Sequence, residues 1–122
     1  MFFPASGWFA AFVLTLALEV PVAGYLLRRA EPDRLRLVVL VAFANLTTHP
    51  IVWYVITQFF LIGTWEYVLV AESWAVAVEA LFYAVAFRGL DPRRAIAAAL
   101  VANAASFTAG RIIGDLWPEV FR

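Results

Sequence analysis

The chain has 122 residues, of which 65% are hydrophobic, and its mean hydropathy is +0.86. A soluble domain of this size cannot bury so much apolar surface, so the composition predicts a membrane protein. Nine basic residues, all Arg, balance nine acidic ones, so no excess positive charge favours nucleic acid as a partner. The chain contains no Cys, which excludes disulfides, thiolate metal sites and a Cys nucleophile.

The first predicted transmembrane helix covers residues 8–27. No basic residue precedes it and Glu19 falls inside the apolar run, so we interpret it as a retained helix and not as a cleaved signal. Pro21 follows Glu19 by two residues and frees the backbone carbonyl of Ala17 from its helical hydrogen bond. Thr15 and Glu19 are four residues apart, so we expect them on one helix face.

Three further apolar runs predict helices over residues 35–62, 65–87 and 95–113. Runs of about twenty residues favour helices, because transmembrane strands need only about ten residues and alternate in polarity. The connections are short, so neighbouring helices should be antiparallel. Residues 1–122 should therefore form a single four-helix transmembrane domain.

The second predicted helix carries Asn45, Thr48 and His49 on one face, followed directly by Pro50. Pro50 frees the carbonyl of Leu46. Two interpretations of the freed carbonyls stay open. They coordinate a cation or a proton, as in interrupted transporter helices, or they mark a kink whose carbonyls neighbouring Thr side chains satisfy.

The third and fourth predicted helices also carry polar residues at helical spacing. Glu72 and Glu79 are two turns apart in the third helix, and Asn103, Ser106 and Gly110 share one side of the fourth. The fourth helix is rich in Ala, and small residues let helix backbones approach closely. We therefore expect it to lie centrally in the bundle or in an oligomer.

Polar residues recur at a fixed spacing, which is informative because polar groups are costly in hydrocarbon. One set recurs after sixty residues, so that Glu19, Arg28, Glu31, Pro32 and Arg34 match Glu79, Arg88, Asp91, Pro92 and Arg94. A second set recurs after fifty-eight residues, so that Asn45 and Thr48 match Asn103 and Ser106. The predicted fold class is an all-α integral membrane protein with four transmembrane helices. It is a tandem repeat of two helical hairpins, about 8–62 and 65–114, with a pseudo-twofold axis along the membrane normal.

The arginines predict the orientation of the chain. Residues 28–36 hold four Arg and residues 88–94 hold three, whereas the middle connection holds none. The positive-inside rule makes the two basic connections cytoplasmic, which places the protein in the cytoplasmic (inner) membrane with both termini outside. Trp8, Trp65 and Trp117 would then form an aromatic belt near the outer boundary.

Depth along the helices predicts one polar site. At a rise of about 1.5 Å per residue, the two matched Glu and the two matched Asn reach similar depths near the bilayer centre. Such groups face a bundle interior or a water-filled cavity. The predicted ligand- or ion-binding residues are Glu19, Asn45, Thr48, His49, Glu79, Asn103 and Ser106. Within this set His49, Glu79 and Glu19 are candidate metal ligands, and a bound cation is the only cofactor expected.

The same residues also fit a structural role. Each Glu would be neutral and donate to an Asn carbonyl on a neighbouring helix, which makes a clasp worth about 1 kcal/mol. Asn45 meets either Glu19 within its hairpin or Glu79 across the axis, and spacing alone does not decide between them. Glu72 and Arg111 lie in the outer half, where we predict an ion pair that neutralises two buried charges, or an outer gate.

Three functions stay open. Cation- or proton-linked transport or conduction is favoured, because acidic groups dominate the predicted site, and four helices enclose so little space that a homo-oligomer is expected. An accessory or binding subunit of a larger membrane complex would use the polar residues as a clasp. An intramembrane Glu/His enzyme, with or without a metal, is the third, although the chain has one His and no G-x-S-x-G or H-E-x-x-H motif.

Overall fold

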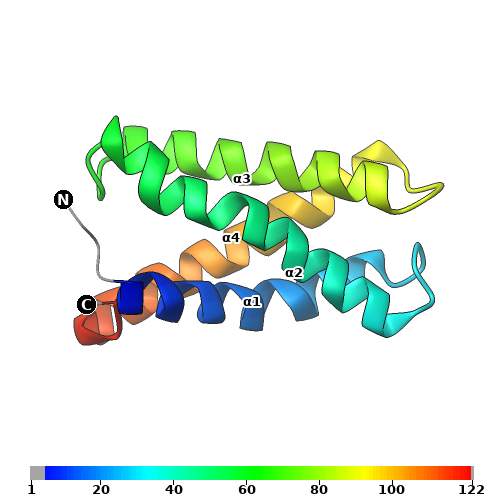
Figure 1. Cartoon of the computed structure of the whole chain (residues 1–122), viewed down its shortest axis with the longest axis horizontal. Helices are drawn as coiled ribbons and strands as arrows, with labels where there is room; N and C mark the ends of the chain where they lie inside the picture. The colour runs from blue at the N-terminus through cyan, green and yellow to red at the C-terminus, as the bar shows by residue number, and fades with distance from the viewer. Residues whose placement is uncertain (1–4, 122) are drawn as a thin grey trace.

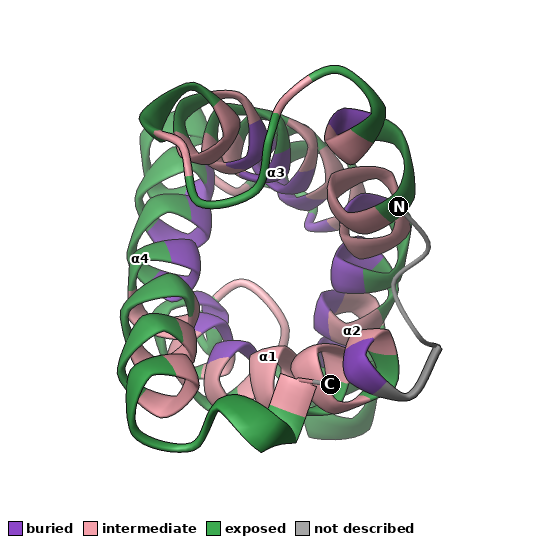
Figure 2. Cartoon of the chain, turned by 90° about the vertical axis from the view of Figure 1, so that its left-hand side faces the viewer, coloured by how far each residue is buried: buried purple, intermediate pink, exposed green. Residues whose placement is uncertain are grey.

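A computed structural model describes residues 5–121, and it is entirely helical between the turns. Its long helices are α1 (Ala5–Leu27), α2 (Arg34–Pro50), α3 (Trp65–Ala86) and α4 (Pro92–Leu116). They alternate in direction, so both ends of the chain lie at one end of the bundle (Figure 1). α1 and α3 each pack against α2 and α4, and therefore occupy opposite corners of the bundle (Figure 2).

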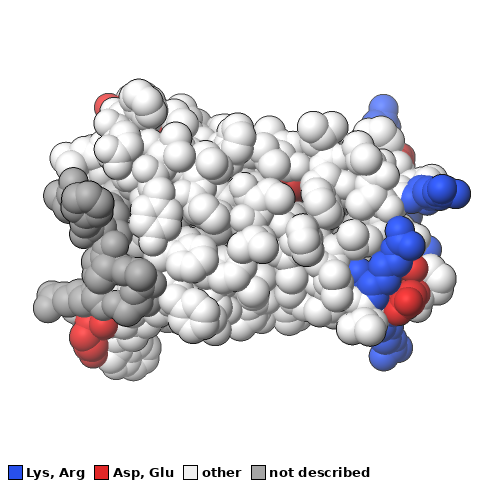
Figure 3. Space-filling view, viewed as in Figure 1, with Lys and Arg blue, Asp and Glu red and all other residues white. Residues whose placement is uncertain are grey.

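All four helices are long and apolar enough to cross a membrane, with mean hydropathy between 1.5 and 1.9. The segments of this kind among the described residues are Gly7–Leu27, Arg34–Gln58, Trp65–Ala86 and Pro92–Leu116. On the face shown in Figure 3, basic side chains gather at one end and the middle is almost free of charge. The prediction of an all-helical chain with four helices of membrane-crossing length is confirmed.

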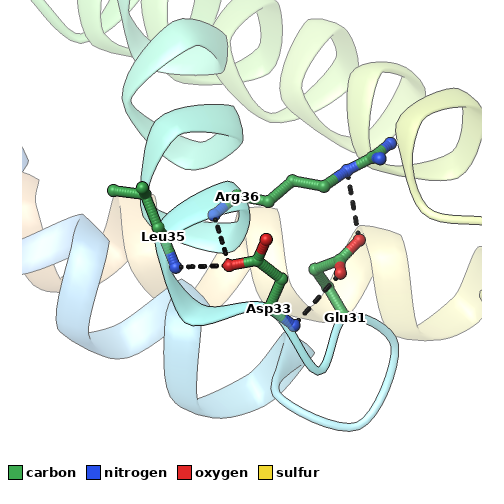
Figure 4. Close-up of polar contacts among 4 residues, drawn as sticks. All are labelled: Glu31, Asp33, Leu35 and Arg36. Atoms are coloured by element: carbon green, nitrogen blue, oxygen red, sulfur yellow. Dashed lines mark hydrogen bonds and ion pairs between the residues drawn. The ribbon is translucent and has the colours of Figure 1, made fainter.

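The turn between α1 and α2 shows how one arginine-rich connection is ordered (Figure 4). Asp33 is the N-cap of α2, and its carboxylate accepts hydrogen bonds from the backbone N–H groups of Leu35 at 3.0 Å and Arg36 at 3.3 Å. Glu31 accepts from the N–H of Asp33 and lies 3.2 Å from the Arg36 guanidinium. The acidic residues of this turn therefore satisfy backbone donors that the first helical turn leaves free.

The turn before α4 repeats this capping arrangement. Asp91 accepts from the N–H of Arg93 at 2.9 Å, and Pro92 occupies the first helical position. Asp33 and Asp91 are fifty-eight residues apart, which is also the spacing of the two matched Asn. Asp91 shares its capping role with Asp33 and not with Glu31, the residue that it matches at the sixty-residue spacing.

The expected second helix is not α-helical throughout. The α-helix ends at Pro50, and the chain continues as a π-helix over Ile51–Val55 and a 3₁₀ turn over Ile56–Gln58. Within the π segment the N–H of Ile56 donates to the carbonyl of Ile51, five residues earlier. Proline lacks the donor that an α-helix needs, and local π turns commonly absorb such a defect.

Helix ends elsewhere differ by a few residues from those expected. Pro21 lies inside α1 without ending it. α4 begins at Pro92 and ends at Leu116, whereas the apolar pattern places it over residues 95–113. Hydropathy detects the apolar middle of a helix, but caps and turns set its ends.

Packing differs between the two halves of the bundle. The half nearer the arginine-rich connections holds a continuous apolar core. Its buried residues are Ala23, Leu27, Leu37, Val41, Ala44, Ala80, Tyr83, Phe87, Ala95, Ala98, Ala99 and Ala102. The Ala residues of α4 allow close helix packing, as expected, but α4 stands at a corner and not at the centre. A Cβ added at Gly110 would meet no atom within 4 Å, so this residue does not serve close packing.

Candidate functional site

The other half of the bundle encloses a cavity of about 390 Å³. It extends from Glu19 and Glu79, near the middle of α1 and α3, to Ile62 and Phe121 at the end where the termini lie. Beyond the two Glu, toward the arginine-rich end, the apolar core fills the bundle. The volume falls within the range of small-molecule sites, and residues from all four helices line it.

Glu79 is completely buried and both of its carboxyl oxygens have partners. The hydroxyl of Thr48 on α2 donates to Oε1 at 2.9 Å, and the amide of Asn103 on α4 donates to Oε2 at 2.5 Å. The same amide nitrogen also donates to the carbonyl of Ala99 at 2.8 Å. Glu79 thereby joins three helices, as the predicted clasp would, but its oxygens accept these bonds, whereas the prediction has each Glu donate to an Asn carbonyl.

Glu19 is also completely buried but only half satisfied. The hydroxyl of Ser106 on α4 donates to its Oε1 at 2.7 Å, whereas its Oε2 has no hydrogen-bond partner. Asn45 lies close to this carboxyl group, yet its amide donates to the carbonyl of Val41 at 3.0 Å. Glu19 therefore presents an unused acceptor in the lining of the cavity.

The sequence left open which Asn accompanies which Glu, and the geometry gives a consistent answer. Each Asn lies with the Glu of its own hairpin, Asn103 with Glu79 and Asn45 beside Glu19. The hydroxyl groups make the contacts between hairpins, Thr48 to Glu79 and Ser106 to Glu19. These two hydroxyl contacts join residues at matched spacings, so the hairpins interlock through equivalent hydrogen bonds.

His49 lies among aromatic rings and lines the same cavity as Glu19 and Glu79. Its ring centroid is 5.3 Å from that of Phe12, 6.0 Å from that of Trp53 and 6.1 Å from that of Trp8. Its Nε2 lies 3.4 Å from the hydroxyl of Thr15, and its Nδ1 is buried without a hydrogen-bond partner. Aromatic residues one turn apart on α1 face α2 and surround this imidazole.

The predicted metal ligands are not arranged to hold a metal ion. Among the described residues, no group of three or more His, Asp or Glu is arranged to hold a metal ion. His49 belongs to the aromatic cluster, and hydroxyl and amide groups from α2 and α4 surround Glu19 and Glu79. The three residues line one cavity, but the expectation that His49, Glu79 and Glu19 together hold a metal ion is corrected, because they are not arranged as a ligand set.

Glu72 and Arg111 both line the cavity but do not form the predicted ion pair. Within the described part of the chain, the only ion pair closer than 4.0 Å joins Arg36 and Glu31. Arg111 is exposed and Glu72 is half-buried, so the two charges are not neutralised by direct contact. Their role as an outer gate stays a prediction.

Sequence reasoning missed Tyr83 and the aromatic lining of the cavity. Tyr83 is completely buried, and its hydroxyl has no hydrogen-bond partner. It follows Glu79 by four residues, so helical spacing already placed the two on one face. Trp53, Tyr67 and Phe107 line the cavity itself, but single aromatic residues in an apolar chain give no comparable signal.

No protein-family model, curated protein or solved structure matches this chain. The chemistry of the cavity therefore decides which functions to consider. Its charged lining groups are three carboxyls, Glu19, Glu72 and Glu79, and one cation, Arg111. This balance favours a cationic ligand over an anionic one.

Proposed function

We propose that this chain is an integral membrane protein that moves a small cation, or protons, through a site formed by Glu19 and Glu79. The main support is that a completely buried carboxyl group with an unused oxygen lines the inner end of the cavity, near the middle of the bundle. Ionisable groups at that depth are costly, and they mark ion and substrate pathways. The cavity reaches one end of the bundle, and a packed core lies toward the other end. Alternating access requires an arrangement of this kind.

We interpret the chain as two related hairpins with a pseudo-twofold axis along the membrane normal. The equivalent contacts of Glu19 with Ser106 and of Glu79 with Thr48 support this interpretation. So does the crossing of α2 and α4 on opposite sides of the bundle, because a half-turn about its long axis would exchange them (Figure 1). Rocking of one hairpin against the other would break both hydroxyl contacts and open the core.

The proposed orientation has the arginine-rich connections in the cytoplasm and both termini outside the inner membrane. The concentration of basic side chains at one end of the molecule supports it (Figure 3). The exposed Trp65 and Trp117 lie at the opposite end, where an interfacial belt would place them, whereas Trp8 packs on Phe12. In this orientation the cavity extends toward the outside.

A homo-oligomer remains part of the proposal but is not needed to create the site, because one chain already encloses the cavity. One observation favours the alternative of an accessory or binding subunit. The fully satisfied Glu79 is what a structural clasp requires. Glu19, with its unused oxygen, does not fit a clasp. The enzyme alternative has less support, because His49 contacts aromatic rings and not a carboxyl group.

Flux through the purified protein in proteoliposomes tests the transport proposal. We expect proton or monovalent-cation flux in wild type, loss of flux in the Glu19→Gln/Glu79→Gln double variant, and unchanged flux in Glu66→Gln. Glu66 is an exposed residue of the first turn of α3 that does not line the cavity, so it controls for the loss of one carboxylate. Undiminished flux in a folded double variant would refute the proposal, and absence of flux in wild type would favour the accessory-subunit alternative.

A further inference from the structure

We propose that the ligand of the cavity is an organic monocation, a protonated amine with an apolar body, whose N–H group donates to Glu19. Glu79 then serves chiefly to hold the helices together. This inference rests on the proposed transport function and names the ligand class of the same site. It follows from the unequal environments of the two carboxyl groups and from the size and lining of the cavity.

The two carboxyl groups have matched positions but unequal hydrogen bonding. Glu79 uses both oxygens on Thr48 and Asn103, so a ligand would have to displace a partner to reach it. Glu19 uses one oxygen on Ser106 and has the other unpartnered while completely buried. Buried polar atoms almost always have partners. No described protein group donates to Oε2 of Glu19, so this oxygen is available to a donor of a molecule in the cavity.

The size of the cavity argues against a bare inorganic ion. Metal cations are held by about four to eight ligand atoms within roughly 2.0–2.6 Å, and no suitable group of three acidic or imidazole side chains occurs among the described residues. The cavity measures about 390 Å³, which is room for an organic molecule. Its walls include Leu14, Val52, Ile62 and Val68, which offer contacts to an apolar body and none to a hydrated ion.

The remaining lining also suits a cation. Trp53 and Tyr67 line the cavity, and aromatic ring faces attract ammonium groups. Glu72 adds a third carboxyl group to those of Glu19 and Glu79, against the single positive charge of Arg111. Arg111 is exposed, so solvent screens its repulsion of a cation more than it screens the buried carboxyl groups.

Binding to the purified full chain in detergent tests the inference. The probes are a series of primary amines from methylammonium to 2-phenylethylammonium, the neutral 2-phenylethanol, and sodium and potassium ions, with calorimetry and tryptophan fluorescence as readouts. We expect saturable binding that tightens as the apolar body grows, and binding of 2-phenylethanol weaker than that of 2-phenylethylammonium by about tenfold or more.

The matched variants separate the two carboxyl groups. Glu19→Gln should weaken 2-phenylethylammonium binding by about tenfold or more, because it removes a charged acceptor. Its Tm should change little. Glu79→Gln should lower Tm more and affinity less, because it disturbs contacts to α2 and α4. Glu66→Gln should change neither quantity. Equal affinity losses in the Glu19 and Glu79 variants, or wild-type affinity in Glu19→Gln, would overturn the inference.

A steric variant keeps the inference testable if Glu19→Gln fails to fold. Gly110 lines the cavity and has open space around a Cβ, so Gly110→Val fills part of the cavity and keeps every carboxyl group. This variant should weaken the binding of 2-phenylethylammonium more than the binding of methylammonium. If no amine binds to wild type but proton or cation flux depends on the two Glu, the ligand class is wrong and the transport proposal stands. Absence of both binding and flux would refute both.

Discussion

Glu19 and Glu79 differ by one hydrogen bond, although their positions are matched. The amide of Asn103 reaches Glu79, but the amide of Asn45 stops at the carbonyl of Val41. Each Asn also donates to the carbonyl four residues earlier, so the local geometry of the two side chains is alike. The two carboxyl groups therefore differ in whether the Asn of the same hairpin reaches them, and Oε2 of Glu19 is the oxygen without a partner.

The two Asn residues should contribute unequally to stability. Asn103→Ala should lower the free energy of unfolding by about 1–2 kcal/mol more than Asn45→Ala, because only Asn103→Ala leaves a buried carboxyl oxygen of Glu79 without a partner. Reversible denaturation in mixed micelles measures the two variants side by side. Equal destabilisation would show that Asn45 bonds to Glu19 in the folded protein.

At the scale of elements, helix ends are set by a few polar residues and one proline. Asp33 and Asp91 start α2 and α4 after the two arginine-rich turns. Pro50 ends α2 and begins a π segment over Ile51–Val55, from which Val52 and Trp53 line the cavity. The break in α2 thus lies one residue after His49 and helps to shape the wall of the site.

Removal of either cap should destabilise the helix that it starts. We expect Asp33→Ala and Asp91→Ala each to lower the free energy of unfolding by about 1 kcal/mol, because the backbone donors that they satisfy lose their partner. Asp33→Asn and Asp91→Asn keep an acceptor and should stay within about 0.5 kcal/mol of wild type. Denaturation curves for the four variants check this. A larger effect of the Asn changes would instead implicate the negative charge.

At the scale of the whole molecule, one half of the bundle is packed and the other half is hollow. Tyr83 and Phe87 fill the packed half beside the small residues of α4. The hollow half faces the end where both termini lie, and Phe121 of the C-terminal turn Pro118–Phe121 reaches its mouth. The cavity reaches this end and the packed core lies toward the other, so the proposed transport would require a second conformation.

Thiol labelling tests this asymmetry. Because the chain contains no Cys, a single substitution introduces the only thiol. A membrane-impermeant thiol reagent added to intact spheroplasts should label Gly110→Cys, which lines the cavity. It should label neither Ala99→Cys in the packed core nor Val101→Cys on the exposed apolar face of α4. Labelling of Val101→Cys would show that this face meets water and not lipid. Labelling of Ala99→Cys would show a cavity that continues through the core.

The polar residues show how far sequence reasoning reaches. Equal spacing from the arginine-rich turns predicted that Glu19, Glu79, Asn45 and Asn103 lie at similar depth, because helical rise is nearly constant. The same reasoning did not predict the aromatic rings around His49, since depth places a residue along a helix but does not say what faces it across the bundle. The ion pair of Glu72 with Arg111 failed for the same reason, because matched depth does not bring two side chains into contact.

The sequence by itself determined the number of helices and their order along the chain, because hydropathy and short connections act locally. The rotation of each helix about its axis was decided only by tertiary packing. That rotation placed His49 among aromatic rings, joined Thr48 to Glu79 and Ser106 to Glu19, and left one oxygen of Glu19 without a partner. Contacts between helices depend on every side chain in the interface at once, so no local pattern in the chain encodes them.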